Sequence, residues 1–129
     1  MSRRAARERA VAMLYEGKIK QISPENVIAA EGESVVDPLT IYLVRGVAKH
    51  QAEIDAMIAA HSSSREFSRV ALLNVCILEI GVFELLVDAN TAAVVINEAV
   101  ELAKKFSDTP SARFINGMLS AVSSELAAR

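Results

Sequence analysis

Residues that bind metals or act as nucleophiles are few in this 129-residue chain. His50, His61 and Cys76 carry its only imidazole and thiol groups. None has a second ligand three or four residues away, the spacing that places two ligands on one helix face. The sequence also has no glycine-rich phosphate loop and no Gly-x-Ser-x-Gly turn. We therefore expect neither a metal site nor a cofactor.

Two carboxylates, Glu79 and Glu84, are the remaining candidates for acid and base catalysis. Five residues apart on a helix, they point in different directions and suit capping or ion pairing better than catalysis. We expect no enzyme. The helix around Glu79 is apolar on nearly every side, so we expect this carboxylate to have a partner such as Arg69, Arg45 or a backbone donor.

The N-terminal segment is richer in chemistry. On a helix, Arg3, Arg4, Arg7 and Tyr15 fall on neighbouring arcs beside a packing face. Arginine binds phosphate through two parallel hydrogen bonds, and an aromatic ring stacks on an unpaired base. The pattern therefore indicates a track for single-stranded RNA. The alternative is an amphipathic helix with a solvated basic face and Tyr15 half buried.

Arg113 and Phe114 form a second candidate, in the first turn of the last expected helix. Free backbone N–H groups at a helix start favour an anion there. An arginine and an aromatic ring at this position would suit a phosphate and a base. Phe114 fits equally well as an anchor in the core.

The composition predicts the kind of fold that positions these residues. The chain is 52% hydrophobic and 23% charged, with five Gly and three Pro, which favours one compact all-α domain over residues 1–129. Six basic residues stand against two acidic ones in the first twenty, although the net charge is −2. The lone cysteine and the lack of a signal region predict a cytoplasmic protein. The most apolar stretch, 70–87, contains three polar residues and predicts a buried helix rather than a membrane span.

Helix-start signals and apolar periodicity predict seven helices. Each proline follows a capping residue, at Ser23-Pro24, Asp37-Pro38 and Thr109-Pro110. Ser63 to Glu66 has the spacing of a capping box, and Asn90 or Thr91 suits another cap. We expect helices over 3–17, 24–31, 38–49, 51–60, 66–88, 92–106 and 110–126, with 66–88 at the centre.

Four segments together resemble the bacterial NusB family of transcription antitermination factors. They are Arg3–Glu16, Leu43–Val47 with Ile54-Asp55, Val95–Phe106 and Arg113–Leu119. The most specific is Ile-Asn-Glu-Ala-Val-Glu-Leu-Ala-Lys, followed closely by Phe-x-Asn-Gly-x-Leu. The resemblance implies an all-helical fold of two packed subdomains and a non-enzymatic RNA-binding factor.

The resemblance also implies partners. A protein of this family pairs with the ribosomal protein NusE, binds the boxA element of nascent RNA and joins the RNA polymerase elongation complex with other Nus factors. It thereby supports transcription of ribosomal RNA operons. By position, Arg3, Arg4, Arg7 and Tyr15 match the RNA-facing first helix, and Arg113 and Phe114 match the RNA-facing start of the last. The NusE surface would lie mainly on the C-terminal subdomain.

Three departures from the family pattern affect this interface. Asn74-Val75 and Leu78-Glu79 replace an acidic-basic pair and a Leu-Arg pair, so a neutral amide and a negative charge lie near the RNA and partner surface. Thr91 replaces a proline. If three or four phosphates are contacted, the single-strand salt slope is about −2 to −3, so we expect modest, salt-sensitive RNA binding.

Two other functions remain open. The chain is rich in Ala, Val and Leu, which suits a self-associating helical module, a homodimer whose RNA binding is weak or lost. NusB-like domains also recruit RNA in ribosomal RNA methyltransferases, of which this chain would be a fragment. Arg7→Glu separates RNA binding from self-association, because it should abolish boxA binding while leaving the helices intact.

Overall fold

The structure is a computed structural model that describes residues 2–62 and 71–129. In chain order its helices are α1 (Arg3–Lys20), α2 (Pro24–Glu31), the 3-10 turn η1 (Glu33–Val35), α3 (Pro38–Lys49), α4 (Gln51–His61), α6 (Leu72–Val87), the 3-10 turn η2 (Ala89–Thr91), α7 (Ala92–Phe106) and α8 (Thr109–Ala127). Within the described residues no strand occurs, which confirms the all-α prediction.

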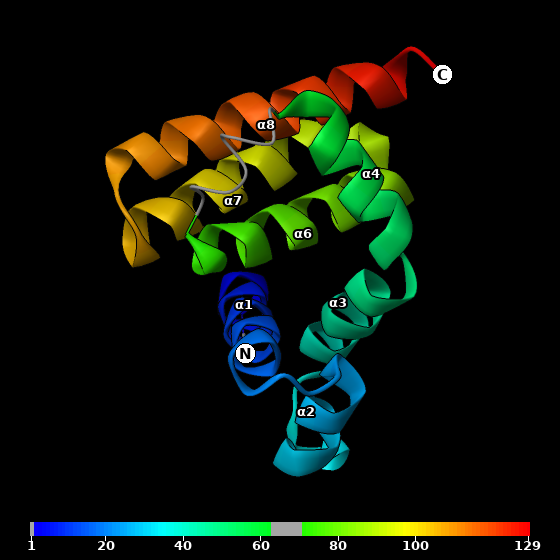
Figure 1. Cartoon of the computed structure of the whole chain (residues 1–129), viewed down its shortest axis with the longest axis vertical. Coiled ribbons are helices and arrows are strands. Elements are labelled where there is room, and N and C mark those ends of the chain that lie inside the picture. Colours follow the sequence, from blue (N-terminus) through cyan, green and yellow to red (C-terminus); the bar gives the residue numbers. More distant parts are fainter. Residues whose placement is uncertain (1, 63–70) are drawn as a thin grey trace.

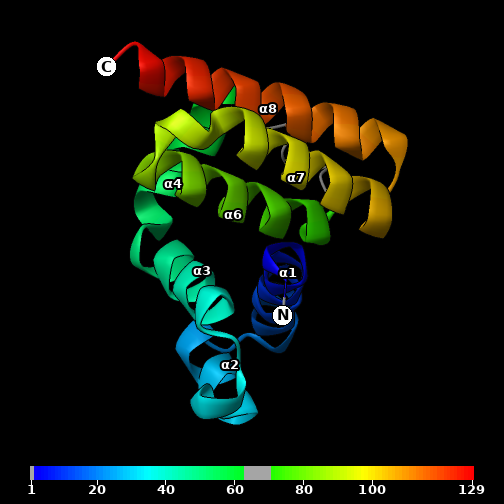
Figure 2. The same cartoon turned by 180° about the vertical axis from the view of Figure 1, so that it is seen from behind.

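The helices form two packed groups, as the family resemblance implies. Figures 1 and 2 show α6, α7 and α8 side by side in one group, with α4 beside them and α1, α2 and α3 gathered in the other. Helix α6 contacts α1 and α3 on one side and α4, α7 and α8 on the other. Ten of its sixteen residues are buried, because its apolar residues surround the helix rather than forming one stripe. It is the central helix of the molecule.

Local capping explains most of the helix starts. The side chains of Ser23 and Asp37 accept backbone N–H bonds at the starts of α2 and α3, each just before a proline. The N-cap residue of α8 lies one position before the expected Thr109. Asp108 caps α8 instead, since Thr109 is already the first residue of the helix and Asp108 Oδ1 accepts from the Ser111 backbone N at 2.8 Å.

Other boundaries differ for physical reasons. Helix α1 continues past Gly17, which is buried against the Ile22 carbonyl and Val27, and ends where Gln21 adopts a left-handed φ of 58°. Asp88 caps η2 through the Asn90 backbone N, and Thr91 precedes α7 at the N-cap position without a side-chain hydrogen bond to the helix. The expected capping box at 63–66 and the expected helical residues 66–70 lie outside the described residues.

Close contact between α3 and α6 fixes the junction of the two groups. A Cβ added to Gly46 in α3 would lie 2.1 Å from Cζ of Phe83 in α6, so only glycine allows this approach. The Phe83 ring also lies against the rings of Tyr42 and His50, with centroids 5.4 and 5.7 Å away. Within the group of α1, α2 and α3, the Thr40 hydroxyl of α3 donates to the Ala6 carbonyl of α1 at 2.9 Å.

Candidate nucleic-acid interface

Ion pairs attach the basic helix α1 to the C-terminal group. Arg4 donates from Nε to Glu98 Oε2 of α7 at 2.9 Å, and Glu8 accepts from Lys105 Nζ at 2.9 Å. The hydrogen bond between Arg4 and Glu98 raises the pKa of the guanidinium and lowers the pKa of the carboxyl. Because Glu8 binds the last turn of α7, the second turn of α1 lies beside the point where the chain turns toward α8.

Arg7 is not on the exposed face that the helical wheel of α1 predicts. Its side chain is only 7% exposed, and its Nε donates to Glu84 Oε1 of α6 at 3.0 Å. The wheel treats α1 as an isolated helix and cannot show that a carboxylate of the central helix lies against it. Arg7→Glu would therefore bring two carboxylates together in a poorly solvated place, and it cannot test RNA binding without disturbing the fold.

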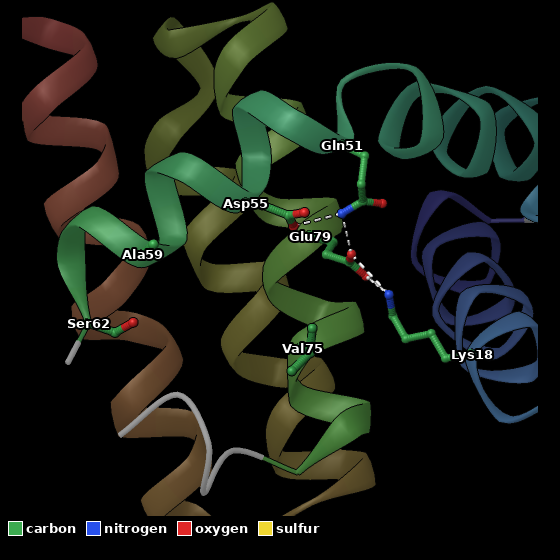
Figure 3. Close-up of a pocket in the computed structure, with 7 residues that line it drawn as sticks. All are labelled: Lys18, Gln51, Asp55, Ala59, Ser62, Val75 and Glu79. Atoms are coloured by element: carbon green, nitrogen blue, oxygen red, sulfur yellow. Dashed lines mark hydrogen bonds and ion pairs between the residues drawn. The ribbon is translucent and has the colours of Figure 1, made fainter. Parts of the chain in front are cut away.

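The second half of α1 is attached by a different acid. Lys18 Nζ lies 3.0 Å from Glu79 Oε1 and 3.1 Å from Oε2, and Gln51 donates to Glu79 Oε2 at 2.8 Å. Figure 3 shows the Gln51 amide between the Asp55 and Glu79 carboxylates, at the edge of a cavity of about 620 Å³. The neutral Gln51 amide separates the two carboxylates, and the Lys18 ammonium neutralises the buried Glu79.

The expectation that Glu79 is buried with a partner is confirmed, but one named partner is wrong. Arg45 instead donates to Glu25 at 2.6 Å and also contacts Glu33, because it projects from α3 toward α2 and η1. Arg69 lies outside the described residues. No residue near Glu79 in sequence is its partner, since the lysine that binds it comes from another helix.

The start of α8 gathers the second set of candidates. Asn74 is buried, and its Nδ2 donates to Ser111 Oγ at 2.8 Å, which ties the first turn of α6 to the first turn of α8. Two residues further on, Arg113 is exposed, while Phe114 is half-buried and packs on the edge of the core. Both interpretations of Phe114 are compatible with this position, because one part of the ring packs and another faces solvent.

The end of α7 adds residues that the sequence analysis left out of the site. Phe106 is 40% exposed, and Lys105 Nζ lies 5.4 Å from its ring centroid. An i,i+4 pair between Glu101 and Lys105 does not form, because Glu101 binds Lys104 while Lys105 reaches across to Glu8. The adjoining residues Lys104, Lys105 and Phe106, two cations beside an aromatic ring, were the available signal in the sequence.

Exposed cations and aromatic rings therefore lie along one edge formed by α1, α7 and α8. We call this edge the basic strip, and its members are Arg3, Arg4, Lys105, Phe106, Arg113 and Phe114. Arg3 and Arg113 are exposed and have no carboxylate within ion-pair distance among residues 2–62 and 71–129. Tyr15, in the fourth turn of α1, is 38% exposed. Such an arrangement can bind phosphates and stack bases.

Other chemistry finds little support in the described residues. His50 packs against Phe83, His61 lies 3.3 Å from Glu125, and Cys76 is buried in α6. Burial raises the pKa of the Cys76 thiol to about 12. Across residues 2–62 and 71–129, no three His, Cys, Asp or Glu side chains gather as metal ligands. None of the helices that the structure describes is long and apolar enough to cross a membrane.

Comparison with known proteins gives one consistent result. The model of the NusB family matches residues 4–124. The chain is 38% identical to the transcription antitermination protein NusB of Bacillus velezensis, over 98% of each chain. It is 35% identical to the protein of the same name from Bacillus subtilis, again over 98% of each.

Solved structures agree with this result. T. maritima NusB superposes with a TM-score of 0.84 at 22% identity, covering 97% of this chain and 92% of that one. A crystal structure of antitermination factors NusB and NusE in complex with double-stranded RNA superposes with a TM-score of 0.82 at 27% identity, covering 95% and 96%.

Proposed function

The chain belongs to the NusB family, and we propose that it is a transcription antitermination factor that binds boxA-type single-stranded RNA together with NusE. In this role it joins the RNA polymerase elongation complex with other Nus factors and supports transcription of ribosomal RNA operons. It acts by binding, with no catalytic step, in the cytoplasm. Relatives named as antitermination proteins and the similar NusB–NusE–RNA structure support this function.

The observation that carries the proposal is the basic strip. A chain of net charge −2 exposes two arginines without carboxylate partners among the described residues, Arg3 and Arg113, close to exposed aromatic rings. Unpaired arginines bind the phosphates of a nucleic-acid backbone, and exposed aromatic rings stack on unpaired bases. Stacking contributes about 1–3 kcal/mol per base and requires little sequence specificity, so NusE or base-edge contacts must supply the selectivity.

The exposed residues of the proposed site have two roles, which follow from the chemistry of their side chains. Arg3, Arg4 and Arg113 bind phosphates, with Arg4 exchanging part of its hydrogen bonding to Glu98 for an RNA oxygen. Tyr15, Phe114 and Phe106 stack on bases. These side chains are all at least partly exposed.

Arg7 and Asn74 act on the RNA through other residues. Arg7 fixes the first turns of α1 by its bond to Glu84, and Asn74 fixes the first turn of α8 by its bond to Ser111. Both are therefore positioning residues in this proposal. NusE binds mainly to the C-terminal group of helices.

Binding to a short boxA-type RNA tests the function. The full chain is titrated into fluorescein-labelled boxA-type RNA and a scrambled control, with and without NusE, near physiological salt. The proposal expects selective binding that NusE strengthens. Equal affinity for both RNAs in the presence of NusE would contradict it.

Light scattering on the same samples examines the competing function. A stable homodimer without RNA selectivity would favour the self-association module. A single-stranded RNA complex of one chain with one NusE supports the antitermination factor. Arg3→Ala and Arg113→Ala should weaken the RNA complex without changing helicity, because both side chains are exposed.

A further inference from the structure

Exposed apolar side chains gather around a groove between the start of α1, α3, the end of α6 and the start of α7. Tyr42 of α3, Val87 at the end of α6 and Val94 at the start of α7 are 52%, 49% and 58% exposed. Single exposed apolar residues are ordinary, but a cluster beside a concave surface is typical of an interaction site. The cluster does not overlap with Arg113, Phe114 or the end of α7.

The groove consists of two adjoining hollows that share Tyr42 and Val87. One has a volume of about 240 Å³ and is also lined by Leu39, Val94 and Val95. The other has a volume of about 270 Å³, and its floor is the Phe83 ring beneath Gly46 and His50. Each hollow is large enough for one bulky side chain, and the aromatic floor is held rigidly between α3 and α6. Rigid apolar pockets of this kind receive anchor residues of a partner.

The charges around the groove are not balanced. Glu84 is neutralised by Arg7, and Arg45 is neutralised by Glu25 and Glu33. Arg3 in one hollow and Lys49 in the other have no carboxylate within ion-pair distance among the described residues. Asp88 is the remaining acid of the lining; its Oδ1 accepts from the Asn90 backbone N at 3.0 Å, and its negative charge offsets that of Arg3 in the same hollow. The groove therefore has an apolar floor, a cation at each end and one positive charge, that of Lys49, that no acid of the lining offsets.

We propose that this groove docks an acidic, amphipathic segment of a partner protein, with two apolar anchors in the two hollows and carboxylates toward Arg3 and Lys49. Tyr42 is the one exposed aromatic ring of the lining, because Phe83 is buried, so the groove gives successive RNA bases no stacking platform. A symmetric pairing of two copies through this face would bring like charges together, which opposes self-association here. The inference goes beyond the proposed RNA function, with which the groove shares Arg3 and the positioning residue Arg7.

A designed peptide provides the probe. It has 16 residues with capped ends, Leu and Phe at i, i+3, i+4 and i+7, Glu at both ends, and a fluorescein label. Its control carries Lys in place of every Glu. Fluorescence anisotropy with the full chain should show binding of the acidic peptide and at least about tenfold weaker binding of the basic one, because electrostatic complementarity opposes the basic peptide.

Variants locate the binding. Tyr42→Ala removes the exposed anchor ring and should weaken acidic peptide binding by about tenfold or more. Lys49→Glu reverses the charge at one end and should do the same, while its exposed position leaves the fold intact. The matched control is Val35→Ala, an exposed apolar residue outside the groove, which should leave the affinity unchanged. Circular dichroism confirms that each variant is folded.

Other outcomes identify a different occupant and overturn the proposal. Equal or absent binding of the two peptides, or an affinity that Tyr42→Ala and Lys49→Glu leave unchanged, excludes an acidic segment in this groove. Loss of boxA-type RNA binding in Lys49→Glu would assign the groove to RNA. A homodimer that Tyr42→Ala dissociates would assign it to a second copy. Retained NusE-dependent RNA binding in both variants keeps this inference separate from the proposed function.

Discussion

The same change from glycine to alanine should have opposite effects at two helical positions. At Gly46, the new Cβ would lie 2.1 Å from Cζ and 2.4 Å from both Cε atoms of Phe83. The ring is buried and has Tyr42 and His50 beside it, so it can shift only by disturbing the α3–α6 junction. At Gly117 in α8, no atom of the described residues outside the helix's own backbone and the two chain neighbours lies within 4 Å of the added Cβ. The first position is overpacked and the second is open.

The magnitudes follow from two competing terms. Alanine stabilises a helix over glycine by about 1 kcal/mol, whereas overpacking a core contact costs about 3 kcal/mol. Gly46→Ala should therefore lower the free energy of unfolding by about 2 kcal/mol, and Tm by about 8 °C for a chain of this size. Gly117→Ala should raise the free energy of unfolding by roughly 0.7 kcal/mol and Tm by about 3 °C.

Thermal unfolding followed by circular dichroism, with urea unfolding on the same samples, measures both changes. The control is internal, because the two variants have the same composition. A Gly46→Ala variant as stable as the parent would refute the close approach of α3 to Phe83. The floor of the proposed docking groove would then be refuted with it.

Three further predictions concern charge and burial. Lys18→Met should lower the free energy of unfolding by about 3 kcal/mol, because it leaves Glu79 buried with only a neutral donor. The double variant Lys18→Met with Glu79→Met should recover most of this free energy, as measured by urea unfolding. A double variant as unstable as Lys18→Met alone would contradict the pairing. The Cys76 thiol, with its pKa raised to about 12 by burial, should react with iodoacetamide at pH 8 only as fast as the chain unfolds; labelling at the rate of a free thiol would contradict that burial. The hydrogen bond from Arg4 lowers the pKa of Glu98, so this pair stabilises the fold at pH values above the pKa of a glutamate in the unfolded chain. The contribution disappears as the pH falls through the lower pKa of the folded state. NMR titration should show a higher Glu98 pKa in Arg4→Met, and an identical pKa in both proteins would rule the contact out.

Local signals in the sequence predicted the elements well. Pro24 and Pro38 follow capping side chains, so the starts of α2 and α3 follow from neighbouring residues alone. The apolar residues around α6 predicted its central position, because a helix without a polar face must be covered on all sides. The sequence predicted that α1 ends at Gly17, but the helix continues to Lys20, because this glycine allows close packing rather than ending the helix.

Contacts between helices were beyond the sequence. Arg7 and Arg3 lie on neighbouring arcs of α1, but only the position of Glu84 on another helix makes Arg7 buried. Glu79 required a partner by its burial, yet the choice of Lys18 depends on how α1 crosses α6. Helical periodicity and residue type identified the candidate RNA-contacting residues that are exposed. Which candidates are buried or ion-paired depends on how the helices pack together, and the sequence of one helix does not show that.

The salt dependence of RNA binding tests the central claim most directly. The apparent association constant of the chain with NusE for boxA-type RNA is measured at several salt concentrations, for the parent, Arg3→Ala, Arg113→Ala and the exposed control Lys20→Ala. Phosphate binding by Arg3 and Arg113 predicts a log–log slope of about −2 to −3 that becomes shallower by about 0.7 in each arginine variant and stays unchanged in the control. A slope near zero, or one that neither arginine alters, would contradict phosphate binding by the basic strip.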